Sequence, residues 1–207
     1  MAVVTIERGQ EWGEPGVLPE HGVVVASDAE ARAIVEEHRR ASKEVPSLGL
    51  VGGDLWRTLG GSADPTRLRE EGARLLPIDI GAALIDGRLH WFVAHLAAHR
   101  GLWRGEAWLA CNAQWWGRWN VAPGAHPDDG RLAIVEADVP VGDRLKVRSR
   151  LRSGSHLPHP GIVVRRSRAA QVEWPAPRSV WLDGERVGSA RRISVRVEPD
   201  AATVVIG

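Results

Sequence analysis

The sequence predicts a reduced α/β lobe over residues 1–66, followed by a β-sandwich-like lobe over residues 67–207. Two observations predict this division. Short apolar runs alternate with helical patterns up to about residue 61, whereas strand-like stretches separated by turns dominate from Arg74 onward. A length of 207 residues suffices for one domain or for two small lobes that share an interface.

The first lobe is predicted from short apolar runs and helix signals. Three runs predict strands, and they cover residues 2–6, 22–26 and 48–53. The run at 22–26 is continuously apolar, which is typical of a buried strand. Ser27 or Asp28 can cap a helix over about 29–41, and Asp54 begins a short helix over 54–61.

The second lobe is expected to be mostly β-structure. Its strand-like stretches are RLLPIDIGAALI, LHWFVAHLA, EAWLACNAQWW, LAIVEADV, GIVVRRS, AAQVEW, SVWLD, RISVRVE and ATVVI. Turn signals such as Asp86-Gly87 and Asp183-Gly184 separate them. One helix is expected at about residues 142–151. Many short strands at this spacing are typical of a β-sandwich.

Composition excludes several classes of function. The formal net charge of +1 argues against a strongly basic nucleic-acid binder. A single cysteine, Cys111, excludes an internal disulfide framework and a multi-cysteine zinc site. The sequence has no apolar stretch of the roughly 18 residues that a membrane-spanning helix needs, so we expect a cytoplasmic protein.

Two acidic turn motifs stand out in the second lobe. PGAHPDDGRLAIV occupies residues 123–135, and VWLDGERV occupies residues 180–187. Each motif alone is equally compatible with an ordinary turn, because Asp-Gly is a common hairpin signal. In this order, and with a strand after each, the two motifs resemble those of the bacterial diacylglycerol and lipid kinase family, over about residues 23–206.

This resemblance implies ATP-dependent phosphoryl transfer to a lipid hydroxyl. Glu185 would accept the proton of the acceptor hydroxyl, and Asp183 would assist it. Asp129 would hold a structural magnesium ion, with carbonyl oxygens of His126 and Arg131 as further ligands. Magnesium prefers such hard oxygen ligands, and a turn can supply a carboxylate together with carbonyl groups.

The nucleotide-contacting segments of the family are only partly kept. LGLVGGDLWRTLGG (48–61) is similar to a nucleotide-contacting strand-turn-helix, which implies that Gly52, Gly53 and Asp54 contribute to nucleotide binding. The family's glycine-rich phosphate signature falls at VVVASDAEAR (23–32), where only Asp28 is retained. The residues that replace the rest of the signature are Ala26, Ser27, Ala29 and Glu30. A glutamate here would place negative charge beside a triphosphate.

Two functions therefore stay open. The chain is either a divergent lipid kinase that uses ATP and Mg²⁺, or a catalytically degenerate relative that binds a lipid, a nucleotide or a protein partner without phosphoryl transfer. The chain lacks two parts of the family pattern, which are an early phosphate-contacting loop and the helices that follow the position of residue 97. The expected partner is a lipid or the membrane surface and not nucleic acid, and a homodimer could complete the reduced lobe.

Three further sets of residues have alternative interpretations. His95 and His99 could bind zinc on a helix, but their stretch predicts a strand. The tryptophans either line an acyl pocket or fill space, and they are Trp103, Trp108, Trp115, Trp116 and Trp119. The basic run either attracts anionic lipid headgroups or forms a solvated helix surface, and it comprises Arg144, Lys146, Arg148, Arg150 and Arg152.

Overall fold

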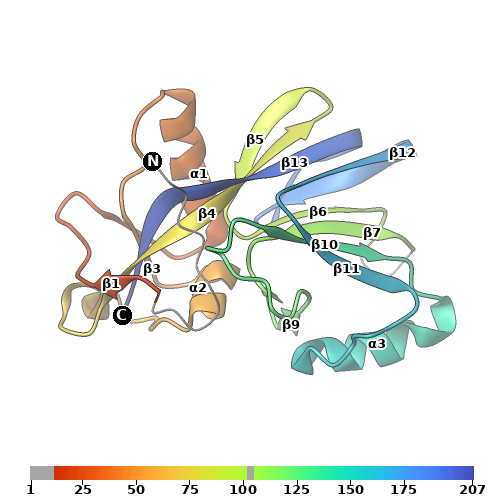
Figure 1. Cartoon of the computed structure of the whole chain (residues 1–207), viewed down its shortest axis with the longest axis horizontal. Coiled ribbons are helices and arrows are strands. Elements are labelled where there is room, and N and C mark those ends of the chain that lie inside the picture. Colours follow the sequence, from red (N-terminus) through yellow and green to blue (C-terminus); the bar gives the residue numbers. More distant parts are fainter. Residues whose placement is uncertain (1–11, 102–104) are drawn as a thin grey trace.

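The computed structural model describes residues 12–101 and 105–207 (Figure 1). The strand expected over residues 2–6 lies outside this part of the chain. In the described part, eleven strands form one sheet, and β8 (Trp115–Trp116) and β9 (Trp119–Asn120) form a separate hairpin. None of the described helices has the length and hydropathy that crossing a bilayer requires.

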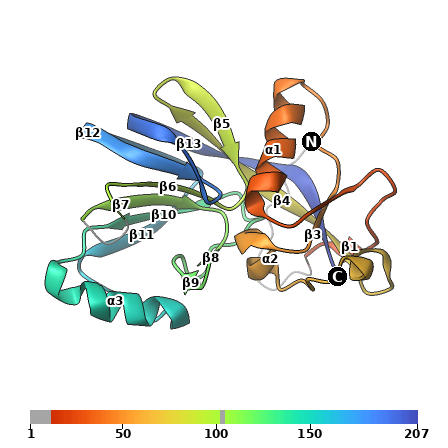
Figure 2. The ribbon, with the colours of Figure 1, turned by 180° about the vertical axis from the view of Figure 1, so that it is seen from behind.

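The N-terminal part is a small α/β unit. Its elements are β1 (Glu14–Pro15), β2 (Val23–Val25), α1 (Asp28–Arg40), β3 (Leu48–Leu50), α2 (Gly53–Leu59) and the 3₁₀ turn η1 (Pro65–Arg69). Strand β2 pairs in parallel with β3, and β3 pairs in parallel with the last strand of the chain. Figure 2 shows α1 and α2 beside this end of the sheet.

The helices of this unit begin where capping chemistry allows. Ser27 is the N-cap of α1 and its hydroxyl accepts a hydrogen bond from the Glu30 amide (3.2 Å). Helix α2 ends at Gly60, whose φ of +81° is readily adopted by glycine. The prediction of a buried strand at 22–26 is wrong in one respect, because β2 lies at the sheet edge and exposes Val23 and Val24.

The remaining strands form two antiparallel layers. They are β4 (Arg74–Ile85), β5 (Arg88–Phe92), β6 (His95–His99), β7 (Ala107–Cys111), β10 (Leu132–Ala137), β11 (Ile162–Ser167), β12 (Ala169–Leu182) and β13 (Glu185–Ile206). One layer runs β5-β4-β13-β12, and the other runs β6-β7-β10-β11. The two layers join where β12 pairs with β6, which confirms the predicted β-sandwich-like architecture.

Apolar side chains between the layers form the core of this sandwich. The fully buried members include Phe92, Leu96, Ile134, Leu182 and Ile193. A second apolar cluster lies under α3 (Arg144–Arg150), which is flanked by the 3₁₀ turns η2 (Val141–Asp143) and η3 (Leu151–Ser153). The helix expected at 142–151 is therefore confirmed.

Several predicted strand boundaries are wrong. AAQVEW and SVWLD belong to one strand, β12, whose register shifts between Glu173 and Arg178, where two prolines fall. RISVRVE and ATVVI likewise belong to β13, which has an irregularity after Glu198. Proline interrupts a ladder but is tolerated at a bulge, so these prolines interrupt the pairing without ending the strand. Conversely, LHWFVAHLA is divided between β5 and β6.

Candidate functional site

A carboxylate at the start of α1 contacts backbone amides at the start of α2. Asp28, the first residue of α1, accepts hydrogen bonds from the amides of Asp54 (2.5 Å) and Leu55 (3.1 Å) at the start of α2. In the turn before α1, the Glu30 carboxylate accepts a hydrogen bond from the Ala26 amide (2.8 Å). Backbone amides that could bind a phosphate at these turns are thus bound by carboxylates of the chain itself.

Close packing of these turns explains the two glycines between them. A Cβ atom on Gly53 would lie 2.6 Å from a carboxylate oxygen of Asp28, and one on Gly52 would lie 2.4 Å from the carbonyl oxygen of Ala26. Gly53 also has a φ of +100°, which favours glycine. The predicted nucleotide-binding residues therefore lie together, and the glycines allow Asp28 to reach α2.

The Asp54 side chain joins these turns to β6 and to the β8–β9 hairpin. Its Oδ1 accepts a hydrogen bond from the Gly117 amide (2.6 Å), and its Oδ2 lies 3.8 Å from Nδ1 of His95. Burial, followed by the nearby charge of Asp28, raises the pKa of Asp54 to about 6. Burial also lowers the pKa of His95 to about 4, so the imidazole is neutral at pH 7.

The turn between β12 and β13 carries the two predicted catalytic residues. The Asp183 side chain is fully buried, and it accepts hydrogen bonds from the amides of Val93 (2.9 Å), Ala94 (2.8 Å) and His95 (2.9 Å). Burial and the negative charge of Asp28 raise the pKa of Asp183 to about 7. These contacts fix the hairpin against the connection between β5 and β6.

Arg32 joins the hairpin to α1. Its Nη2 lies 2.5 Å from Oε2 of Glu185, and its Nε lies 3.9 Å from Oδ2 of Asp183. The Glu185 side chain is 64 % exposed and so remains accessible from solvent. Sequence reasoning missed Arg32, although its position four residues after Asp28 places both side chains on one face of α1.

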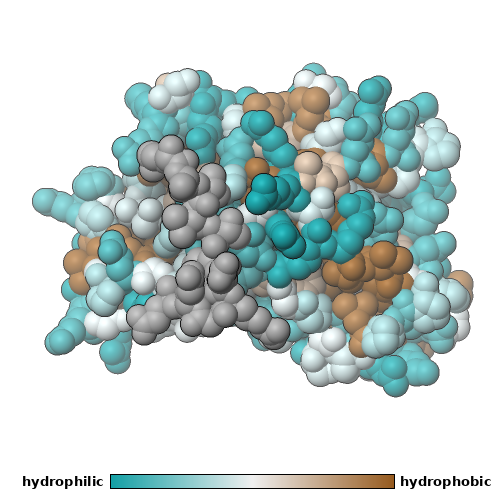
Figure 3. All heavy atoms as spheres, viewed as in Figure 1, coloured by the Kyte–Doolittle hydropathy of each residue, from teal (hydrophilic) through white to brown (hydrophobic). Residues whose placement is uncertain are grey.

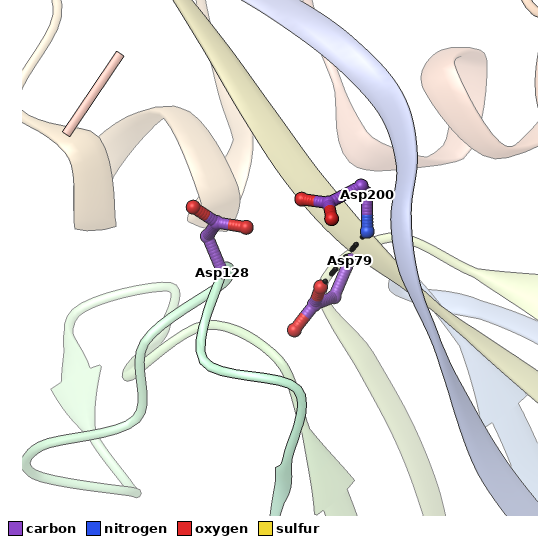
Figure 4. A group of neighbouring side chains, drawn as sticks. All are labelled: Asp79, Asp128 and Asp200. Carbon is purple, nitrogen blue, oxygen red and sulfur yellow. Dashed lines mark hydrogen bonds between the residues drawn. The ribbon is translucent and has the colours of Figure 1, made fainter. Parts of the chain in front are cut away.

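A second group of acidic side chains lies where β4, β13 and the loop before β10 meet (Figure 4). Asp79 of β4, Asp128 before β10 and Asp200 of β13 offer carboxylate oxygens within 4.8 Å of one another. Burial raises the pKa of Asp79 to about 6, and it also raises the pKa of Asp128, which shares a hydrogen bond with Asp200. Three oxygen donors of this kind suit Mg²⁺.

Sequence reasoning missed Asp79 and Asp200. A signal for Asp79 was available, since Ile78-Asp79-Ile80 places an aspartate between two apolar residues of a predicted strand. Such an aspartate is expected to be buried, and a buried carboxylate requires hydrogen-bond or ionic partners. Asp79 has such partners, since it accepts hydrogen bonds from the amides of Gly130 (2.7 Å) and Asp200 (3.2 Å).

The three predicted magnesium ligands lie beside this acidic group. Oδ2 of Asp129 forms an ion pair with Arg166, and its Oδ1 accepts a hydrogen bond from the Arg131 amide (3.1 Å). Nδ1 of His126 accepts a hydrogen bond from the Asp128 amide (3.2 Å). With both Asp129 oxygens engaged, a magnesium ion at this carboxylate would have to displace the Arg166 guanidinium.

An apolar pocket opens between the second sheet layer and α3. Its lining includes Leu109, Trp116, Trp119, Val135, Val147 and Ile162, with Arg144 and His156 as polar members. The Trp116 ring also stacks near His95, with ring centroids 6.2 Å apart. The pocket is therefore linked through one indole to His95, which lies beside Asp54 and whose amide binds Asp183.

Comparison with known proteins identifies a family and a fold. Residues 81–206, or 126 of the 207 residues, match the model of the YegS C-terminal NAD kinase beta sandwich-like domain. A crystal structure of a diacylglycerol kinase from Bacillus anthracis str. Sterne has a TM-score of 0.62 at 13% identity, over 90% of this chain and 76% of that one.

Two further structures from the same bacterium resemble the chain in the same way. They have TM-scores of 0.67 and 0.65 at 14% identity, and each match covers 90% of this chain and 78% of the other. At sequence identities this low, the structural similarity shows that the fold is shared and shows nothing further. A search of curated protein sequences finds no match.

Proposed function

Because the chain belongs to the family of the YegS C-terminal, NAD kinase β-sandwich-like domain, we propose that it is a lipid kinase-like protein that transfers a phosphoryl group from ATP to a lipid hydroxyl. The observation that carries the proposal is the fixed hairpin with an accessible Glu185. Its carboxylate accepts the proton of the lipid hydroxyl, while buried Asp183 positions the hairpin.

Arg32 has a matching role in this proposal. Its guanidinium holds the Glu185 carboxylate in the present arrangement. Guanidinium groups bind phosphate oxygens in a bidentate manner. When a phosphoryl group enters the cleft, Arg32 binds it and releases the Glu185 carboxylate to accept the proton.

The apolar pocket supports a lipid as the acceptor. Its lining is almost entirely hydrocarbon, and Trp116 lies between it and His95. In this proposal the polar end of such a chain lies on the side of Trp116, toward His95, whose amide binds Asp183. This function predicts that the acceptor has at least one long hydrocarbon chain.

Magnesium would offset the phosphate charge when bound. The carboxylate oxygens of Asp79, Asp128 and Asp200 are suitable donors. We retain Asp129 with carbonyl oxygens of His126 and Arg131 as the alternative set, which requires movement of Arg166.

The contacts of Asp28 favour a second candidate function. As folded, the Asp28 carboxylate binds the two amides at the start of α2, and these amides do not fit a phosphate at the same time. A protein with this arrangement would bind a lipid in the cleft without phosphoryl transfer. The two candidates differ in whether ATP displaces Asp28.

Transfer of labelled phosphate from ATP to a panel of lipid alcohols tests the first candidate. We expect wild-type turnover, and we expect Glu185→Gln to lower it by at least about 100-fold because the base is lost. Glu173→Gln is the matched control, since Glu173 is an exposed glutamate elsewhere on β12 and should retain activity.

Thermal unfolding with ATP and Mg²⁺ separates the candidates. A ligand that binds only the folded chain raises the melting temperature. Three negative results together would reject the kinase proposal and favour the second candidate. They are no turnover, no effect of Glu185→Gln, and no change of the melting temperature with ATP. Micromolar ATP binding together with turnover would reject the second candidate.

A further inference from the structure

The segment from Val141 to Ser153 has one buried face and one unusually apolar exposed face. Val147 and Leu151 point inward and line the pocket under α3. On the exposed side, Val141 and Leu145 are 75 % and 79 % accessible, the highest values among the exposed large hydrophobic side chains of the described chain. Burial within the protein therefore does not account for these two residues.

The same segment concentrates positive charge. It contains one acidic residue, Asp143, and five basic residues, which are Arg144, Lys146, Arg148, Arg150 and Arg152. The segment thus has a formal charge of +4, in a chain whose total is +1. Lys146, Arg150 and Arg152 are exposed, as Leu145 is, whereas Val147 on the same helix is buried.

We propose that this face, defined by Val141, Leu145, Lys146, Arg150 and Arg152, docks on a bilayer that contains anionic lipids. Exposed apolar side chains enter the boundary between headgroups and acyl chains, while lysine and arginine bind the negatively charged surface. The charge of the face is complementary to such a surface.

Neighbouring surface continues the apolar character of this face. Figure 3 shows a hydrophobic patch over the position of β11, next to α3, and Val163 of β11 is 55 % exposed. The apolar pocket lies on the inner side of the same helix. Docking through the outer face would therefore leave α3 between the pocket and the bilayer. The inference concerns binding to a membrane and does not depend on phosphoryl transfer.

Co-sedimentation of the full chain with vesicles tests the proposal. We expect binding to vesicles of phosphatidylcholine with phosphatidylglycerol, and weaker binding to phosphatidylcholine alone or at high salt. The double variant Val141→Gln, Leu145→Gln should lower the partition coefficient by about tenfold, because insertion scales with buried apolar area. Lys146→Gln with Arg150→Gln should remove the preference for anionic vesicles.

Matched variants elsewhere provide the controls. Leu84→Gln with Leu89→Gln changes two exposed leucines of the β4–β5 hairpin, and Arg191→Gln with Arg192→Gln changes two exposed arginines of β13. Both should bind vesicles as the wild type does. Three results would each overturn the proposal. They are no binding to vesicles, binding that does not depend on anionic lipid, and binding that the control variants reduce as much as the test variants do. Loss of a dimer in Val141→Gln, Leu145→Gln without vesicle binding would identify a second copy as the occupant instead.

Discussion

Three buried or partly buried carboxylates, those of Asp28, Asp54 and Asp183, determine the electrostatics between α1, α2 and the β12–β13 hairpin. Burial raises the pKa of each one, and Asp28 adds to the shift at the other two. Arg32 is the cation that contacts Asp183 from α1. Holding all three carboxylates ionised in the fold therefore costs free energy, which is a common property of sites that bind cations or protons.

The residue-scale prediction concerns Asp54→Asn, which keeps an oxygen for the Gly117 amide. The pKa of Asp54 is raised from 3.8 to about 6, so its contribution to stability is fully present below about pH 4 and is lost as pH rises through 6. The free energy of unfolding of the variant, relative to the wild type, should increase by about 1–2 kcal/mol from pH 4 to pH 7, after a discount for partial solvent exposure. Urea unfolding at both pH values measures this, and a constant difference would contradict it.

At the scale of elements, the β4–β5 hairpin depends on one close approach. Gly81 pairs with Phe92 across the hairpin, and a Cβ atom on Gly81 would lie 2.1 Å from the Phe92 ring. Phe92 is fully buried between the layers, so its ring has little space to move. The hairpin also leads directly to the amides that bind Asp183.

Gly81→Ala is therefore expected to destabilise the protein by about 2–3 kcal/mol through overpacking. Chemical denaturation measures this loss. Gly142→Ala is the control, because a methyl group added to Gly142 would have no neighbouring atoms within 4 Å and should change stability by less than about 0.5 kcal/mol. Equal effects of the two substitutions would exclude packing against Phe92 as the cause.

Local sequence signals predicted helices and turns well, but they did not predict contacts between residues far apart in the sequence. The Ser27 cap, the Gly60 stop and the Asp183-Gly184 turn each depend on chemistry within a few residues, and the sequence displays it. The ion pair of Arg32 with Glu185 joins residues 153 positions apart, so no local pattern indicates it. The lengths of β12 and β13 also escaped prediction, because prolines that usually end a strand lie at their bulges.

At the scale of the whole molecule, β13 connects both parts of the chain. It pairs with β3 of the α/β unit, and with β4 and β12 of the sandwich. Unfolding either part would remove pairing partners from the other. The division at residues 66 and 67 stays a prediction, and we expect the two parts to share their stability through β13.

Because β13 pairs with strands of both parts, we expect a single cooperative unfolding transition. Far-ultraviolet circular dichroism, which reports mainly on the sheet, and tryptophan fluorescence, which reports on both parts, should give the same midpoint in urea. The ten tryptophans make the second probe sensitive. Separate midpoints would show that the two parts unfold independently despite β13.

The position of Asp28 at the start of α2 has a consequence for regulation of the cleft. The carboxylate acts as an intramolecular competitor, present at a high effective concentration wherever the chain is folded. The net binding free energy of an incoming anion would be reduced by the free energy that is needed to displace the Asp28 carboxylate. Because burial raises the pKa of Asp28, this carboxylate would lose its charge at a higher pH than an exposed aspartate would, and its hold on the two amides would then weaken.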